Sequence, residues 1–100
     1  MRPNGKVEDG IDGWRLDVAE QRPAKFWADW NALVRKLNPN AYTVAELWQN
    51  AAEMVRDGGF SATMNYYAFA FPVKAFLIDN NISASRFAEL LESRRRNFPA

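Results

Sequence analysis

Gly10-Ile11-Asp12-Gly13-Trp14-Arg15-Leu16-Asp17-Val18-Ala19 is the stretch that decides the fold. Its apolar side chains predict a short, almost fully buried strand. Arg15 and Asp17 lie inside this stretch, and a buried charge is costly unless it is paired, so we expect the two to contact each other. Residues two apart share one strand face. The pair therefore has two interpretations: a structural ion pair, or a site at the C-terminal end of a parallel strand, where α/β sheets bind ligands.

Two motifs resolve this choice. Gly13-Trp14-Arg15-Leu16-Asp17-Val18-Ala19 resembles the fourth-strand motif of the α-amylase family, glycoside hydrolase family 13, and is most similar to its cyclomaltodextrinase and neopullulanase-like members. The resemblance implies that Asp17 is the nucleophile and that Arg15 keeps it ionised and oriented. One βα unit later, Thr43-Val44-Ala45-Glu46-Leu47-Trp48 resembles the fifth-strand motif, which implies that Glu46 is the general acid/base. Two motifs in this order and spacing are more specific than either alone.

The resemblance also implies residues that bind the substrate. Ser61-Ala62-Thr63-Met64-Asn65-Tyr66 resembles the sixth-strand segment of neopullulanase-like enzymes, in which an Asn-Tyr pair ends the strand near the active site. The resemblance thus implies that Asn65 and Tyr66 are substrate-binding residues and that the substrate is an α-1,4-glucan or maltooligosaccharide. Trp48 follows the second motif, where an aromatic ring either stacks on a sugar or packs at the rim, and both interpretations stay open.

The spacing of the two acids suits a retaining glycosidase, whose carboxyl groups lie roughly 5–5.5 Å apart. Neighbouring parallel strands are about 4.8 Å apart, so acids at the ends of adjacent strands meet this requirement. Asp17 lies next to the positive Arg15 and should stay ionised for attack on the anomeric carbon. Glu46 has no arginine beside it in the sequence and is flanked by apolar residues, so we expect it to donate the proton to the leaving oxygen.

The remaining pattern predicts an α/β chain with three parallel strands in sequence order, βαβαβα plus a terminal helix. The resemblance implies that these elements are part of a (β/α)8 TIM barrel. Strands are expected over about 10–18, 41–47 and 60–66. Helices are expected from Arg22-Pro23 to Asn38, over 50–57, over 69–79, and from a Ser83 cap to about residue 96. The first helix carries an apolar stripe, which indicates core packing rather than a carbohydrate platform. The stripe comprises Phe26, Trp27, Trp30, Leu33, Val34 and Leu37.

Composition excludes several classes of function. The formal net charge is +1, which gives no electrostatic footprint for nucleic acid or an anionic membrane. The chain has no cysteine and no histidine, so thiol nucleophiles, zinc–thiolate sites and serine–histidine chemistry are excluded. Acid/base chemistry must then fall to carboxylates. No apolar run approaches the roughly 20 residues of a membrane span, and the N-terminus lacks the apolar core of a signal peptide. The compartment is therefore undetermined from the sequence, with the cytoplasm slightly favoured.

We interpret residues 1–100 as a partial catalytic domain covering strands four to six of the barrel, with residues 1–9 as the loop before the first strand. In the family that loop can hold calcium, but oxygen ligands are sparse here, so no metal or cofactor is expected. Ala45 stands where the family usually has glycine. The third catalytic aspartate and the third-strand motif have no counterpart in the sequence, so the isolated chain is expected to be inactive.

Two alternatives to an enzyme remain open. The first is a catalytically inert partial barrel that acts as a structural or assembling piece, and the second is a complete α/β binding module that only echoes the motifs. A partial barrel leaves sheet edges open, and open edges invite pairing, so self-association is expected. The coding sequence on either side would discriminate between these alternatives, since it either continues the barrel or does not.

Overall fold

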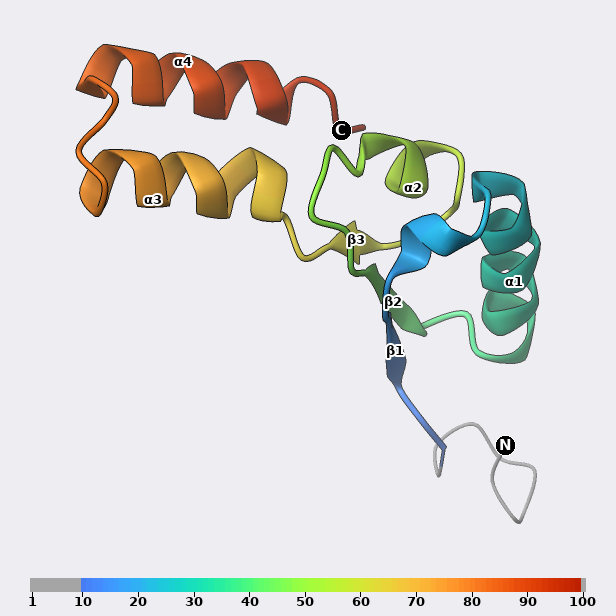
Figure 1. The fold of residues 1–100 in the computed structure, drawn as a ribbon. Coiled ribbons are helices and arrows are strands. Elements are labelled where there is room, and N and C mark those ends of the chain that lie inside the picture. The colour runs from blue at the N-terminus through green and yellow to red at the C-terminus, as the bar shows by residue number, and fades with distance from the viewer. Residues whose placement is uncertain (1–9, 100) are drawn as a thin grey trace.

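The computed structural model describes residues 10–99 and contains a parallel sheet of three strands (Figure 1). The strands β1 (Gly13–Leu16), β2 (Tyr42–Ala45) and β3 (Ala62–Thr63) lie in sequence order. Leu16 is opposite Ala45, and Ala45 is opposite Thr63. The residues that follow the three strands therefore lie together at the C-terminal end of the sheet. The predicted order and direction of the strands are confirmed, although each strand is shorter than the sequence pattern indicated.

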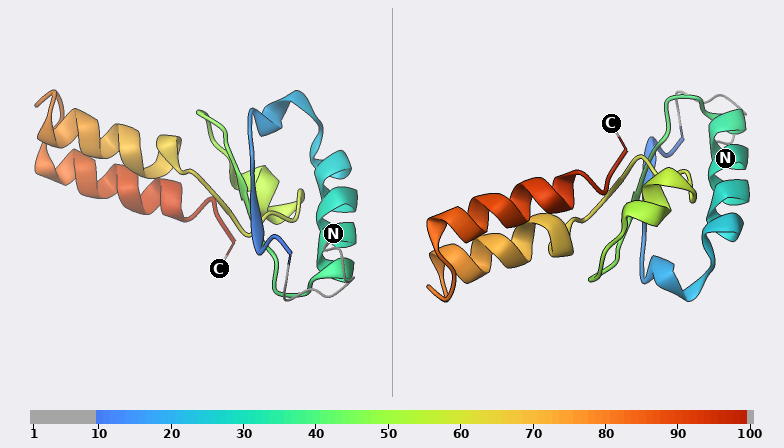
Figure 2. Two further views of the ribbon diagram at one scale, coloured as in Figure 1. Left: turned by 90° about the horizontal axis from the view of Figure 1, so that it is seen from below. Right: turned by 90° about the horizontal axis from the view of Figure 1, so that it is seen from above.

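Two helices connect the strands. After a 3-10 turn, η2 (Ala19–Gln21), helix α1 (Ala24–Leu37) leads from β1 to β2, and α2 (Ala52–Arg56) leads from β2 to β3. Pro23 precedes α1 and Asn38 ends it, as the sequence predicted, because proline fits a helix start and needs no N–H there. Figure 2 shows α1 on one side of the sheet, where it shields the core.

The core is small and lies between α1, β2 and α2. Trp27 is 8% exposed and contacts Phe60 with ring centroids 5.3 Å apart, while its Nε1 donates a hydrogen bond of 2.7 Å to the Ala19 carbonyl. A polar network crosses the same core. The Thr43 hydroxyl donates to Asn31 Oδ1 at 2.7 Å, and Asn31 Nδ2 donates to the Gly58 carbonyl at 2.8 Å. Buried polar groups are tolerated when satisfied in this way.

The apolar stripe of α1 is only partly buried. Trp27 and Asn31 face the core, one turn apart, and Trp30 packs beside them. Three members of the predicted stripe are instead exposed, because a sheet of short strands gives the helix a narrow surface to cover: Phe26, Leu33 and Leu37. The interpretation of the tryptophans as core rather than sugar-binding residues is confirmed for Trp27 and Trp30.

The expected burial of the first strand is wrong. Trp14 is 45% exposed, Ile11 is exposed, and the Arg15 and Asp17 side chains are 49% and 71% exposed. The physical reason is position: β1 is at the edge of the sheet, and β2 is its one strand partner within residues 10–99. A charged pair at such an edge keeps contact with water, so there is no large desolvation cost that the pairing would have to offset.

The last third of the chain is a helical hairpin. A π-helical turn, η3 (Tyr66–Ala70), runs into α3 (Phe71–Leu77), and α4 (Ala84–Arg95) packs back against both. The Ser83 side chain accepts a hydrogen bond from the Arg86 N–H at 3.1 Å and so caps α4, as predicted. The hairpin extends away from the sheet (Figures 1 and 2), and the molecule measures 55 × 25 × 24 Å. Among residues 10–99, every helix falls short of the length and apolar character that a bilayer crossing demands.

Candidate active site

Three charged side chains meet where β1 and β2 end. Arg15 Nη1 donates to Asp17 Oδ1 at 2.5 Å, and Arg15 Nη2 lies 4.0 Å from Glu46 Oε2. Asp17 directly follows the end of β1, and Glu46 directly follows the end of β2. The parallel register therefore brings both acids to one arginine. The expectation that the two carboxyl groups lie at the same end of the sheet is confirmed.

The role of Arg15 differs in one respect from the sequence interpretation. The sequence assigned Arg15 to Asp17 alone and left Glu46 without a cationic neighbour. The guanidinium in fact lies between the two acids, because adjacent strands in register place Arg15 next to Val44, close to Glu46. A planar guanidinium with several N–H groups can serve two carboxylates at once.

Glu46 is held much more firmly than Asp17. Its side chain is 7% exposed, and Oε2 accepts a hydrogen bond of 2.7 Å from the Val18 backbone N–H. The Glu46 backbone also bonds to the first chain segment, through Glu46 N to the Leu16 carbonyl and Ala19 N to the Glu46 carbonyl, each at 3.0 Å. One carboxylate is thus fixed and shielded, and the other is open to solvent, which suits two acids with different tasks.

Val18 reaches Glu46 through an unusual backbone conformation. Its φ and ψ are 44° and 53°, in the left-handed region, which β-branched residues rarely adopt. The turn formed by Asp17 and Val18 follows the end of β1 at Leu16 and directs the Val18 N–H toward Glu46. No sequence pattern predicts this conformation, because valine is among the residues least expected at positive φ.

Aromatic rings lie beside the charged group. Trp48 and Tyr66 stack with ring centroids 3.9 Å apart and an interplanar angle of 11°. The Phe71 ring lies 6.2 Å from Trp48 and 6.3 Å from Tyr66, so it flanks the pair. Trp48 is 53% exposed. The structure thus joins two of the predicted substrate-binding residues and adds Phe71, which the sequence interpretation had assigned to a helix without a role in the site.

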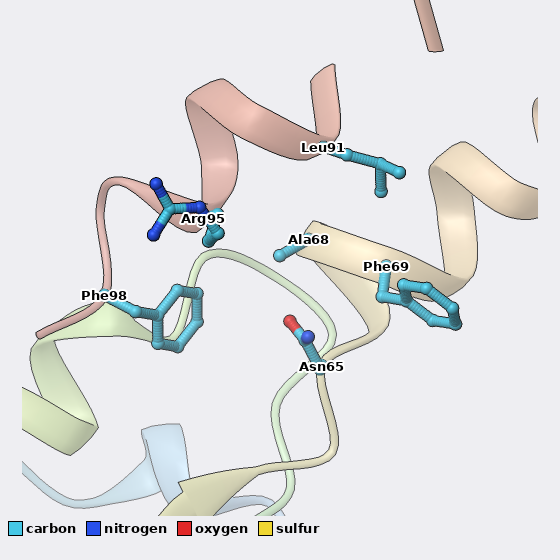
Figure 3. Close-up of a pocket in the computed structure, with 6 residues that line it drawn as sticks. All are labelled: Asn65, Ala68, Phe69, Leu91, Arg95 and Phe98. Atoms are coloured by element: carbon cyan, nitrogen blue, oxygen red, sulfur yellow. The ribbon is translucent and has the colours of Figure 1, made fainter. Parts of the chain in front are cut away.

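Asn65 lies apart from this group. It adopts the left-handed conformation at φ 60°, which asparagine tolerates, and turns the chain from β3 into η3. Its side chain lines a pocket of about 360 Å³ between η3 and the end of α4, and Figure 3 shows the amide pointing into it. The other lining residues are Ala68, Phe69, Leu91, Arg95 and Phe98. The residue of this segment that contacts the charged group is Met64, through Arg15 Nε, and the Tyr66 hydroxyl in turn contacts the Met64 sulfur.

The structure offers no obvious metal centre in the part of the chain that it describes. Within residues 10–99, histidine, cysteine, aspartate and glutamate side chains form no group of three that could hold an ion. The loop in which the family resemblance implies calcium corresponds to residues 1–9, which lie outside the described residues.

Comparisons with known proteins bear on this site. No family model matches the chain. Curated relatives do match: neopullulanase 2 of Thermoactinomyces vulgaris is 43% identical over 89 residues, and a cyclomaltodextrinase of a Bacillus species is 36% identical over 92 residues. These alignments include 88% and 92% of this chain. The chain corresponds to part of an α-amylase-family protein, glycoside hydrolase family 13.

Solved structures of this family share the fold. The cyclic α-maltosyl-(1→6)-maltose hydrolase of Arthrobacter globiformis superposes with a TM-score of 0.82 at 34% identity over 94% of this chain. A cyclomaltodextrinase superposes with a TM-score of 0.81 at 36% identity over 92%. The neighbours are TIM-barrel enzymes, so the predicted partial α/β barrel is confirmed. The chain spans about 15% of the length of neopullulanase 2 and 21% of the Arthrobacter hydrolase.

Proposed function

We propose that this chain supplies the nucleophile and the general acid/base of a retaining α-glucan-acting glycoside hydrolase or transglycosylase. Residues 1–100 would form strands four to six of its catalytic barrel. The observation that carries the proposal is the shared arginine: Arg15 contacts Asp17 and approaches Glu46 where two adjacent parallel strands end. Retaining glycosidases require two carboxyl groups roughly 5–5.5 Å apart, a separation that the ends of neighbouring parallel strands can supply.

The geometry suggests how each group acts. Asp17 is exposed and paired with a cation, so its free oxygen can attack the anomeric carbon and form a covalent glycosyl intermediate. Glu46 uses Oε2 to accept the Val18 N–H, which leaves Oε1 to donate a proton to the leaving oxygen. The same oxygen would then take the proton of the water or sugar hydroxyl that releases the intermediate. Arg15 orients the nucleophile and keeps its charge balanced.

The substrate class is proposed from the relatives and from the aromatic rings. The relatives include cyclomaltodextrinases, and one neighbouring structure holds maltose in a cyclic α-maltosyl-(1→6)-maltose hydrolase. An α-1,4-glucan or maltooligosaccharide is accordingly the proposed substrate. Trp48, which is 53% exposed, and Tyr66, which stacks on it, would form an aromatic contact for a sugar ring. We keep Asn65 as a proposed substrate contact at a neighbouring position.

A graft tests this function. Residues 10–66 replace strands four to six of an active α-amylase-family host, and turnover of maltooligosaccharides is measured. Asp17→Asn in the graft should reduce kcat by on the order of 10⁴-fold without loss of folding. The control is Asp29→Asn, an exposed acid on α1 that pairs with Lys25, and it should change turnover little. If the graft is active and the kcat of Asp17→Asn stays within a few-fold of the kcat of the parent graft, the assignment of Asp17 as nucleophile is wrong.

A second candidate function is that of an inert partial barrel that assembles with further chains. It is favoured by the shape of the molecule: the radius of gyration is 16.4 Å, above the roughly 13 Å of a compact 100-residue domain. Trp14, Tyr42 and Leu37 are also exposed close to β1 and β2. Self-association through the open sheet edges is the expected consequence.

Two measurements on the 100-residue chain examine this second candidate. Analytical ultracentrifugation at rising concentration should show association, and a compact monomer with a sharp cooperative melt would contradict it. Hydrolysis of maltooligosaccharides by the isolated chain should be negligible. Saturable release of reducing sugar by the purified chain would instead show that residues 1–100 suffice for catalysis.

A further inference from the structure

Arg15 has a third partner, on the third strand. Its Nε donates to the Met64 Sδ at 3.4 Å, in addition to the contacts of Nη1 with Asp17 and of Nη2 with Glu46. Met64 directly follows β3, and its N–H donates to the Ala45 carbonyl at 3.1 Å, which continues the sheet ladder. One guanidinium therefore spans the ends of all three strands.

The sulfur contact differs from the two carboxylate contacts in what it fixes. Arg15 is 49% exposed, and an exposed ion pair alone restrains a long side chain weakly. The Nη atoms lie at the tips of the planar group, whereas Nε lies at its base. A partner at Nε therefore limits rotation of the whole plane, and the plane determines where both Nη atoms point.

Met64 is itself restrained from the other side. The Tyr66 hydroxyl lies 4.0 Å from the same sulfur and donates toward it, and the Tyr66 ring stacks on Trp48. A thioether is a weak acceptor, but it is polarizable and can contact two donors at once. The sulfur thus lies between the charged group and the aromatic rings.

We propose that Met64 is a positioning residue: its sulfur fixes the plane of the Arg15 guanidinium and thereby the orientation of Asp17. Its relevance to catalysis rests on the proposed function, whereas the contact itself does not. Met64 is 39% exposed and does not belong to the buried core, and its sulfur accepts from Arg15 Nε, so it does more than fill core volume.

The contact is tested by NMR on the 100-residue chain. Arginine is labelled with ¹⁵N and the methionine methyl groups with ¹³C. Exchange of the Arg15 Nε–H proton with water should be slow relative to that of Arg22 Nε–H, and Met64→Leu, which keeps the volume and removes the acceptor, should speed it by about tenfold. Met64→Gln, which restores an acceptor, should recover slow exchange. An unchanged Arg15 rate in Met64→Leu would overturn the proposal.

A reciprocal variant covers the case in which Met64→Leu disturbs folding. Arg15→Lys removes the Nε donor, so the Met64 methyl signal should shift. The methyl signal of Met54, which is 6% exposed in the core, reports on folding and should stay in place. A Met64 signal that does not move in Arg15→Lys, with Met54 unchanged, would also overturn the proposal.

Kinetics separate this inference from the proposed function. In the active graft, Met64→Leu should lower kcat by about tenfold with little change in KM, because a misplaced nucleophile affects the transition state rather than binding. Met64→Gln should recover most of the rate. An unchanged kcat in Met64→Leu would overturn the positioning role even if the NMR contact is present. Activity that survives Asp17→Asn would overturn the function and leave the contact in place.

Discussion

The Val18 backbone N–H donates a hydrogen bond of 2.7 Å to Glu46 Oε2. The residue that follows the proposed nucleophile therefore holds the proposed acid/base. Val18 achieves this in a left-handed conformation, with φ 44°, and such a conformation costs a non-glycine residue of order 1–3 kcal/mol. The hydrogen bonds between the Leu16–Ala19 segment and the Glu46 backbone keep it in place. Strain at this position is thus tied directly to the geometry of the two acids.

This strain predicts an inverted order of stability at residue 18. Val18→Gly should be more stable than Val18→Ala by about 1 kcal/mol, since alanine retains the left-handed penalty and glycine does not. The matched control is Val34, inside α1, where alanine should be the more stable replacement by a similar amount. Urea unfolding at low protein concentration measures both pairs. An alanine variant at residue 18 as stable as the glycine variant would show that the strain is absent in solution.

Glu46→Gln should separate two kinds of substrate in the active graft. Natural maltooligosaccharides need protonation of the leaving oxygen, so their turnover should fall by about 10²–10⁴-fold. A dinitrophenyl glycoside needs no such proton and should be far less affected. Glu53→Gln, an exposed glutamate in α2, serves as the control. Equal losses on both substrates would assign Glu46 a role other than proton donor.

Asn31 should be important for stability rather than for chemistry. Its replacement by alanine leaves the Thr43 hydroxyl and the Gly58 carbonyl without their buried partner, which should cost about 2–3 kcal/mol in the free energy of unfolding. Asn40→Ala, at an exposed asparagine, should stay within about 0.5 kcal/mol of the parent. If the free energy of unfolding falls by the same small amount in both variants, the buried network contributes little to stability.

The hairpin should weaken in acid. Hydrogen bonds from Arg95 and then Arg96 lower the pKa of Glu92 to about 2. Because this folded-state pKa lies below the ordinary value of 4.5, the pairing stabilises α4 fully above that value and is lost as the pH falls through about 2. Titration of the Glu92 carboxyl carbon by NMR measures the midpoint, and Arg95→Gln should raise it. A midpoint near 4.5 in the parent chain would contradict the pairing.

Much of the fold and the centre of the site could be predicted from the sequence. The two motifs placed Asp17 and Glu46 at the ends of adjacent strands, and proline, serine and glycine marked the ends of helices. Burial could not be predicted in the same way. The apolar pattern around Trp14 indicates that these side chains are suited to burial. Whether they are buried depends on which strands and helices pack against them, and β1 is at the edge of the sheet.

The details that orient the site were also beyond the sequence. Val18 reaches Glu46 through a conformation that its residue type disfavours, and Met64, which follows β3, reaches Arg15 on β1 across the intervening strand β2. Arg15 serves both acids because of the register between strands, which no local pattern encodes. Asn65, grouped with Tyr66 in the sequence, adopts a left-handed backbone conformation where β3 leads into η3, and its side chain lines a separate pocket.

The proposed role of Asp17 as the nucleophile is tested most directly by trapping the covalent intermediate. The active graft is treated with a fluorosugar fluoride, whose glycosyl-enzyme ester hydrolyses slowly, and is then digested and mapped by mass spectrometry. One added sugar is expected on the peptide that contains Asp17, and none in Asp17→Asn. A label on Glu46 or on a host residue, or an active graft that forms no covalent ester, would contradict it.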